Sequence, residues 1–186
     1  MAAREKYDEA RVIEQLHNQA TCKAAFGKVI EHYSSQLYWQ IRRLVIDHDD
    51  ANDVLQNVFI KAWTHLDTYR QDSKVSTWLY RIAINESLDY MRKQKAHSTI
   101  SADAEDAGIA QRLLADRYFD GTEAEALLQE AMERLPDVQR TVFQLRYYDE
   151  MKYSDMSELL HTSEGSLKAS YHIAVKKIAE FFHQHD

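Results

Sequence analysis

Aromatic and cationic side chains gather near the middle of the chain, in a combination that suits an unpaired strand of nucleic acid. Trp78 and Tyr80 offer flat rings on which a base can stack, and such stacking contributes about 1–3 kcal/mol per base. The cations that could contact phosphate groups lie nearby in the sequence: Arg70, Lys74 and Arg81. Burial of Trp78 at the start of a helix is the alternative interpretation, and the residue types alone leave it open.

No combination of residues points to catalysis. We find no nucleophile paired with a base, no glycine-rich phosphate loop and no spacing typical of a metal site. The one cysteine, Cys22, excludes an internal disulfide and a cysteine-rich zinc site, and a small residue on a helix face explains it better. His183 and His185 lack further ligands at a suitable spacing, so we interpret them as part of a frayed tail. We therefore expect a protein that is not an enzyme and that binds no cofactor and no metal.

Length and composition favour an all-α protein. The chain of 186 residues has room for one large or two small domains, and 45% hydrophobic residues suffice for a core. Four glycines and one proline leave few breaks, and strand-like alternation is absent. No apolar run approaches the roughly 20 residues needed to span a bilayer, and the N-terminus does not resemble a signal peptide. We expect a cytoplasmic protein without membrane insertion.

Two long helical patterns, joined by a short polar stretch, run from residue 50 to residue 95. Asp50 and Ser76 are the expected N-caps, because a side-chain oxygen can accept hydrogen bonds from first-turn amides. The first pattern has an apolar stripe at helical spacing, formed by Leu55, Phe59, Ala62 and Leu66. The second has a broader stripe, formed by Leu79, Tyr80, Ile82, Ala83, Ile84, Leu88 and Met91. We expect the two helices to pack antiparallel.

The rest of the chain divides into a first helical domain, a linker and a second helical domain. Helical patterns over 8–19 and 21–46 complete a first domain of about four helices, residues 8–95. Over 96–121 the pattern weakens into small, polar and acidic residues that are typical of a linker. The second domain then covers 122–186.

The second domain has the spacing of a helix-turn-helix. Thr122 and Glu125 form a capping box at its first helix. The apolar side of the next helix is expected to comprise Val138, Val142, Phe143 and Leu145. A short helix over 154–160 and a turn precede a last helix that begins at Glu164, with Ser163 as its N-cap. The residues of that helix expected to pack inward are Leu167, Tyr171, Ala174 and Ile178.

The net charge of −7 is carried by the middle of the chain. Between residues 101 and 133 two arginines, Arg112 and Arg117, stand against nine acidic residues: Asp103, Glu105, Asp106, Asp116, Asp120, Glu123, Glu125, Glu130 and Glu133. The charges of the flanking parts balance. Those parts can therefore present local basic patches to nucleic acid, for which an acidic protein is otherwise unsuited.

The two long helical patterns also resemble a known family. The extracytoplasmic-function (ECF) sigma factors of bacterial RNA polymerase, members of the sigma-70 family, have a core domain similar to DANDVLQNVFIKAW followed by STWLYRIAINESLDYMRK. The matching residues are Asp50, Ala51, Asp53, Gln56, Phe59, Ala62 and Trp63, then Ser76, Thr77, Trp78, Leu79, Tyr80, Arg81, Ile82, Ala83, Asn85, Leu88, Asp89 and Arg92. Asn52 and Asn57 depart from the family, which often has Glu there.

The last helix resembles the recognition helix of the sigma C-terminal domain. The matching residues are Glu164, Gly165, Lys168, His172, Ala174 and Lys176. Ser170, Ile173 and Val175 depart from the pattern, because Arg is common in the family at these positions.

The resemblance implies three binding surfaces. The first, which would dock on the clamp helices of the largest polymerase subunit, comprises Asp50, Asp53, Gln56, Asn57 and Lys61. The second, which would read the −10 promoter element, comprises Tyr69, Arg70, Gln71, Asp72, Ser73, Lys74, Trp78, Tyr80, Arg81, Asn85 and Arg92. The third, which would contact the −35 element, comprises Ser163, Glu164, Gly165, Ser166, Lys168, Ala169, Ser170, His172 and Lys176. A solvated polar face is the alternative interpretation of the first surface.

The function implied is that of a sigma factor that directs core RNA polymerase to promoters and helps to open them. Its fold would be a region 2-like and a region 4-like helical domain joined by an acidic linker, which either threads the polymerase channel or is a solvated tether. The partners implied are core RNA polymerase, through its clamp helices and its flap, promoter DNA and an anti-sigma factor. The alternatives are a helix-turn-helix regulator that acts without polymerase and a helical adaptor that binds only protein.

Overall fold

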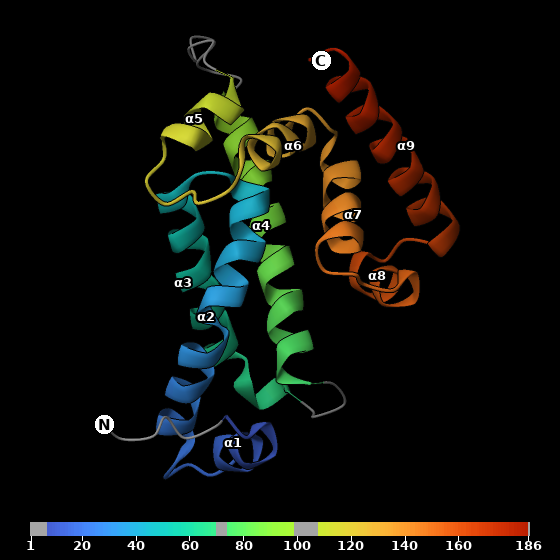
Figure 1. Ribbon diagram of the computed structural model, residues 1–186. Helices are drawn as coiled ribbons and strands as arrows, with labels where there is room; N and C mark the ends of the chain where they lie inside the picture. The colour runs from blue at the N-terminus through green and yellow to red at the C-terminus, as the bar shows by residue number, and fades with distance from the viewer. Residues whose placement is uncertain (1–6, 70–73, 99–107, 186) are drawn as a thin grey trace. The chain divides into compact units, whose positions relative to one another are not determined.

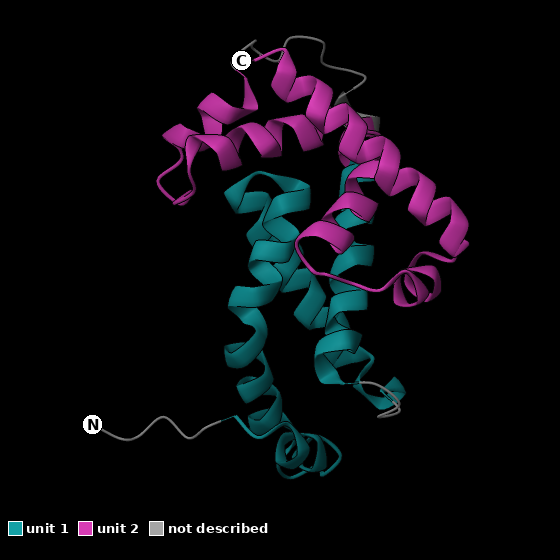
Figure 2. Ribbon diagram, turned by 45° about the vertical axis from the view of Figure 1, so that its right-hand side comes forward, with its two compact units in different colours: residues 1–93 teal, residues 94–186 magenta. Residues whose placement is uncertain are grey.

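The computed structural model describes residues 7–69, 74–98 and 108–185, and within those ranges it contains helices and no strands (Figure 1). The chain divides into two compact units, residues 1–93 and 94–186 (Figure 2). The prediction of an all-α protein is confirmed. None of the helices in the described ranges is long and apolar enough to cross a membrane.

Unit 1 is a bundle in which three long helices run alternately up and down (Figure 1). Its elements are α1 (Glu9–Leu16), α2 (Cys22–Val45), α3 (His48–Thr64), the 3-10 turn η1 (Leu66–Thr68) and α4 (Val75–Ser98). The helices α3 and α4 run antiparallel, as predicted, and share one hydrophobic core with α2. Their remaining faces include many exposed residues.

The buried stripe of α3 is centred on smaller residues than predicted. The most deeply buried residues of α3 are Ala51, Val54, Val58 and Ala62. Of the predicted stripe, Phe59 and Ala62 are buried, whereas Leu55 and Leu66 are only half-buried. Small and β-branched side chains let neighbouring helices approach closely, and close packing favours them at the centre of the stripe.

Two predicted N-caps are wrong. The helix α3 begins after Asp47, whose carboxylate accepts the backbone N–H of Asp50 at 3.1 Å, so Asp50 lies in the first turn. The helix α4 begins at Val75, so Ser76 lies inside its first turn. The Val75 N–H donates instead to the Glu9 carboxylate at 2.9 Å, a partner 66 residues away that no local pattern reveals.

Unit 2 contains the predicted helix-turn-helix. Its helices are α5 (Ile109–Ala115), α6 (Glu123–Glu133), α7 (Asp137–Tyr147), α8 (Tyr153–Leu160) and α9 (Glu164–His183). Ser163 caps α9, as predicted, by accepting the backbone N–H of Ser166 at 3.3 Å. On α9, Leu167, Ala174 and Ile178 are buried.

The segment 96–121, which we predicted to be a linker, contains the helix α5. Its Ala110 and Leu113 are buried, and α5 packs against α6. The Glu130 carboxylate on α6 accepts the Ala110 N–H at 3.0 Å, so it satisfies a first-turn amide of α5. The predicted linker residues 99–107 lie outside the described residues.

The capping box of α6 is confirmed in both directions. The Glu125 N–H donates to the Thr122 hydroxyl at 3.2 Å, and the Thr122 N–H donates to the Glu125 carboxylate at 2.6 Å. On α7 the prediction was wrong for Val138, which is 60% exposed. The buried side of α7 instead includes the polar residues Thr141 and Gln144.

His183 and His185 do not lie in the frayed tail that we predicted. The helix α9 continues to His183, and the His185 ring stacks on Phe181 with 4.0 Å between ring centroids. The His185 ring nitrogen Nδ1 also lies 2.7 Å from the Phe181 carbonyl oxygen. Packing on the buried Phe181 ring therefore holds His185 against the end of α9.

Candidate functional site

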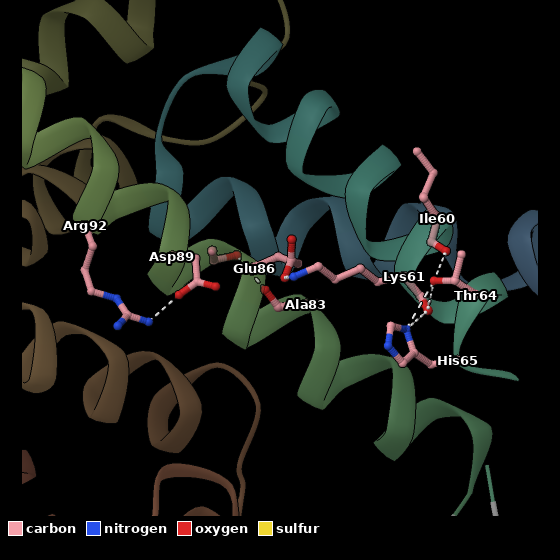
Figure 3. Close-up of polar contacts among 9 residues, drawn as sticks. Ile60, Lys61, Thr64, His65, Ala83, Glu86, Asp89 and Arg92 are labelled. Carbon is pink, nitrogen blue, oxygen red and sulfur yellow. Dashed lines mark hydrogen bonds and ion pairs between the residues drawn. The ribbon is translucent and has the colours of Figure 1, made fainter. Parts of the chain in front are cut away.

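A cavity of about 470 Å³ lies between α3 and α4, within unit 1. Of the residues predicted to read the −10 element, the cavity brings together Trp78, Asn85 and Arg92. It also includes Lys61, which we had assigned to the polymerase-binding surface, and Glu86, which we had not predicted at all. Figure 3 shows the Lys61 side chain reaching from α3 to Glu86 on α4. We call this site the α4 cavity.

Helical spacing explains why these residues meet. The α4 residues of the cavity recur every three or four positions, which places them on one face of the helix: Trp78, Ile82, Asn85, Asp89 and Arg92. The helix α3 and its end contribute Lys61 and His65, which are one turn apart. The antiparallel arrangement of the two helices sets these two faces side by side.

Each cation of the α4 cavity is paired with a carboxylate. The Lys61 ammonium lies 2.5 Å from a Glu86 carboxylate oxygen, and the Glu86 side chain is only 12% exposed. Arg92 pairs with Asp89 one turn earlier on α4 (Figure 3). The cavity therefore attracts a phosphate less strongly than its content of Lys and Arg suggests, since each positive charge already has a close partner.

The cavity has the chemistry to hold a single flat polar ring. The half-buried Trp78 offers a stacking surface, and Ile82 adds an apolar contact. The Asn85 amide can both donate and accept hydrogen bonds, whereas the Glu86 and Asp89 carboxylates accept them. Pockets of this size and mixed lining are typical of sites for small or extruded groups.

Other residues of the predicted −10 surface lie elsewhere. Tyr69 is only 4% exposed and packs against Trp78, with 5.1 Å between ring centroids, so it belongs to the core. Its burial, together with the nearby Glu9 charge, raises the pKa of the Tyr69 hydroxyl. Lys74 and Arg81 are exposed and Tyr80 is half-buried, but none of the three lines the cavity. The predicted residues Arg70, Gln71, Asp72 and Ser73 lie outside the described residues.

The predicted polymerase-binding residues Asp53, Gln56 and Asn57 are all exposed on α3. Asp50 is half-buried at the start of that helix. Two large apolar residues that we had not assigned to this surface, Ile60 and Trp63, are 60% and 44% exposed. They continue the same face at helical spacing, and that spacing from Asp53 and Gln56 was the signal available in the sequence. We call this surface the α3 face; its members are Asp53, Gln56, Asn57, Ile60 and Trp63.

The predicted −35 residues form an exposed face of α9, the α9 face. Its exposed members are Ser163, Glu164, Gly165, Ser166, Lys168, Ala169, His172 and Lys176, whereas Ser170 is half-buried. Lys168 lies 3.2 Å from Glu164, and Lys176 lies 3.9 Å from Glu180. Like the α4 cavity, the α9 face carries cations that have local acidic partners. Ile173, which is 44% exposed, adds an apolar group that we had not included.

Among the described residues, no group of three or more His, Cys, Asp or Glu side chains is arranged to hold a metal ion. Cys22 is a free, half-buried thiol near the start of α2. The chemistry of the described surfaces is therefore that of binding through stacking, hydrogen bonds and paired charges.

Comparison with known proteins assigns both units to families. Residues 29–97 match sigma-70 region 2, and residues 125–178 match sigma-70 region 4. The ECF RNA polymerase sigma factor SigW of Bacillus subtilis is 32% identical over 158 residues, which cover 80% of this chain and 83% of that protein. The RNA polymerase sigma-H factor of Pseudomonas aeruginosa is 30% identical, over 79% of this chain and 80% of that protein.

Solved structures with the same fold include two complexes. The sigma factor RpoE from Bartonella quintana, solved with the anti-sigma factor NepR, has a TM-score of 0.68 at 22% identity, covering 85% of this chain and 96% of RpoE. CnrH, solved with the cytosolic domain of CnrY, has a TM-score of 0.65 at 22% identity, covering 96% of each chain.

Proposed function

The chain belongs to the ECF sigma factors of the sigma-70 family, and we propose that it binds core RNA polymerase through the α3 face and reads promoters through the α4 cavity and the α9 face. It directs promoter-specific transcription initiation. In this proposal the polymerase supplies the catalysis, and the sigma factor acts in the cytoplasm without enzymatic chemistry of its own.

The observation that carries the proposal for the −10 element is the α4 cavity. An aromatic ring, an amide and carboxylates converge there, as a site for one unpaired base requires. Because Lys61 and Arg92 are already paired, the cavity favours a base over the phosphate backbone. The base would enter the cavity only after it has left the duplex, so this contact would assist promoter opening.

The α3 face supports the proposal of a polymerase-binding surface. Polar side chains lie beside an exposed tryptophan and an exposed isoleucine, and such a mixture of an aromatic anchor with a polar surround is typical of reversible protein interfaces.

The α9 face supports the proposal of −35 recognition. It follows the turn of a helix-turn-helix, and the N-terminal residues of such a helix contact base edges in the major groove.

Replacing Lys168 and His172 with Glu would put negative charge against phosphates or base acceptors. We expect transcription from a promoter with a −35 element to fall sharply, and wild-type levels from a folded variant would reject the assignment.

Reconstitution with core RNA polymerase tests the proposed function directly. The purified chain and core enzyme are combined with a library of genomic fragments, and run-off transcripts are sequenced. We expect specific transcripts that depend on the chain. Core enzyme that gives no specific transcript on any fragment would reject the function. Tight duplex binding without polymerase would favour a helix-turn-helix regulator, and absence of DNA binding even with polymerase would favour an adaptor.

We also propose that an anti-sigma factor restrains this chain. Support comes from RpoE of Bartonella quintana, which has the same fold and was solved in complex with an anti-sigma factor. Co-expression of a genomic library with a reporter for the promoters found above should reveal a fragment that silences the reporter. A direct complex between the encoded protein and this chain, seen by size-exclusion chromatography, would complete the test.

A further inference from the structure

The N-terminal helix α1 reaches the beginning of α4, the helix that carries most of the α4 cavity. The Glu9 side chain, at the first position of α1, accepts a hydrogen bond from the Val75 backbone N–H at 2.9 Å. Val75 is the first residue of α4 and is 1% exposed. The helix α1 and the beginning of α4 lie at the same end of unit 1 (Figure 1). Glu9 therefore satisfies a first-turn amide of α4, which a residue close in sequence would usually satisfy.

The surroundings of Glu9 hold it in place. Tyr7 stacks on His32, with 3.7 Å between ring centroids and 4° between ring planes, and meets the edge of Tyr33. Burial raises the pKa of Tyr7 and of Tyr33, and the nearby Glu9 charge raises both further. The same charge also acts on Tyr69, as described above. Residues 7–9 are thus anchored on α2 by aromatic packing, beside the carboxylate that caps α4.

The capped turn is directly connected to Trp78. The Trp78 N–H donates to the Lys74 carbonyl at 3.2 Å, so Trp78 closes the first turn of α4. Its ring packs against Tyr69 on one side and lines the α4 cavity. A shift of the first turn would move the ring of Trp78 relative to Asn85 and Arg92, which lie on later turns.

We propose that Glu9 is a positioning residue for promoter opening, because its hydrogen bond to Val75 holds the first turn of α4, and with it Trp78, in place at the α4 cavity. The inference rests on the proposed function of that cavity. Glu9 touches no base in this proposal and acts only through α4.

Two substitutions of Glu9 in the full chain test the proposal. One changes the length of the side chain, and the other changes its charge. Glu9→Asp keeps the negative charge at the start of α1 but shortens the side chain, so the carboxylate no longer reaches Val75. Glu9→Gln keeps the reach and an accepting oxygen but removes the charge. Glu14→Asp makes the same shortening at an exposed position of α1 and is the matched control.

We expect Glu9→Asp to slow promoter opening by core polymerase about tenfold, the effect of losing one hydrogen bond to a charged group. Glu9→Gln should retain most of the opening rate, and Glu14→Asp all of it. Permanganate reactivity of unpaired thymines reports opening, and co-elution reports core binding, which should be unchanged in all three variants. Hydrogen exchange of the amides of residues 75–79 should accelerate in Glu9→Asp alone.

The outcomes separate this inference from the function on which it rests. If the wild-type chain opens no promoter, the proposed function fails and the inference fails with it. If the wild type opens promoters and Glu9→Asp does so at the same rate, only the inference is overturned. Parallel loss of core binding and opening in Glu9→Asp would also overturn it, because a general loss of stability would then explain the defect.

Discussion

Trp78 stands at the boundary between the core of unit 1 and the α4 cavity. The sequence leaves open whether this ring is buried or available for stacking. In the structure one part of the ring is buried and another part lines the cavity. The ring packs against the buried Tyr69 and is itself half-buried, yet it lines the cavity. A ring already held by the core loses little side-chain freedom when a base stacks on it, which favours the stacked complex.

Trp78→Ala should depress promoter opening more than initial duplex binding. Stacking contributes about 1–3 kcal/mol per base, so we expect the opening equilibrium to fall about tenfold. Trp78→Phe retains a ring and should keep most of the opening. Permanganate footprinting on the reconstituted holoenzyme measures opening, and mobility shift at low temperature measures duplex binding. Unchanged opening in Trp78→Ala would return this tryptophan to a purely structural role.

His161 has a backbone conformation that its side chain does not favour. It ends α8 with φ 51° and ψ 41°, the left-handed region in which glycine carries no steric cost. His161 is exposed and lies outside the α9 face.

His161→Gly should therefore raise the free energy of unfolding by about 0.5 kcal/mol, as relief of strain exceeds the added entropy of the unfolded chain. His161→Val, which places a β-branched residue there, should lower it by about 1 kcal/mol. Urea unfolding followed by circular dichroism gives both values. A glycine variant less stable than the wild type would contradict the argument.

At the scale of single elements, α3 divides its surface between the core and the proposed docking surface. Its small buried stripe allows close packing, and the α3 face lies on the exposed remainder. A variant that changes only the α3 face should leave the fold intact and affect only binding.

Asp53→Arg combined with Gln56→Ala should weaken binding to core polymerase by about tenfold or more, because charge reversal in a complementary interface is strongly unfavourable. Helical content should not change, since neither residue contributes to the core. The matched control, Glu31→Arg with Gln36→Ala, makes the same change on exposed positions of α2. Size-exclusion co-elution with core enzyme measures the effect. Equal co-elution of both double variants would reject the α3 face as the docking surface.

The capping box of α6 gives that helix a pH dependence with a defined sign. The Thr122 backbone N–H, and then the Thr122 hydroxyl, lower the pKa of Glu125 by hydrogen bonding to its charged form. A carboxylate with a lowered pKa in the folded state stabilises the fold above its unfolded pKa of about 4.3. That stabilisation is lost as the pH falls through the lowered pKa of the folded state.

Glu125→Gln should therefore lower the thermal midpoint at pH 7, and the difference from the wild type should vanish in strongly acidic solution. Glu123→Gln, which removes a charge in the same turn without breaking the box, is the matched control and should show a smaller difference at pH 7. Thermal scans at a series of pH values test this. A difference that persists at the acid end would show that Glu125 acts through something other than its charged form.

Some helices and helix starts could be predicted from the sequence, and others could not. Apolar periodicity located the long helices, because each buries one face and repeats at 3.6 residues per turn. The start of α4 was misplaced because its cap, Glu9, comes from a distant part of the chain. The helix α5 was missed because seven residues span only about two turns, which is too short for a clear periodic signal, and because Glu130 on α6 supplies part of its stabilisation.

The same holds for the α4 cavity: some of its residues could be grouped from the sequence, and others could not. Trp78, Asn85 and Arg92 could be grouped in advance because the family resemblance assigns all three to the −10 surface. The pairing of Lys61 with Glu86 could not, because it depends on the register between two antiparallel helices, and periodicity within each helix does not determine register.

At the scale of the whole molecule, the charges explain how an acidic protein can contact DNA. The net charge is −7. On the candidate DNA surfaces, Lys61, Arg92 and Lys168 each lie beside a carboxylate. Non-specific affinity for duplex DNA comes almost entirely from unneutralised cations that displace counterions from phosphates. A protein of this charge pattern depends on a partner to hold it on DNA.

The isolated chain should therefore bind duplex DNA poorly, whereas the same chain bound to core polymerase should select promoters. Binding measured against salt concentration should give a shallow slope, below about 2 in a log–log plot, since each phosphate contact contributes about 0.9 to the slope. With core enzyme, promoter fragments should compete far better than fragments of equal length without promoters. A steep salt slope and tight binding by the isolated chain would mean that its cations are free to contact phosphates, and DNA recognition would then need no polymerase.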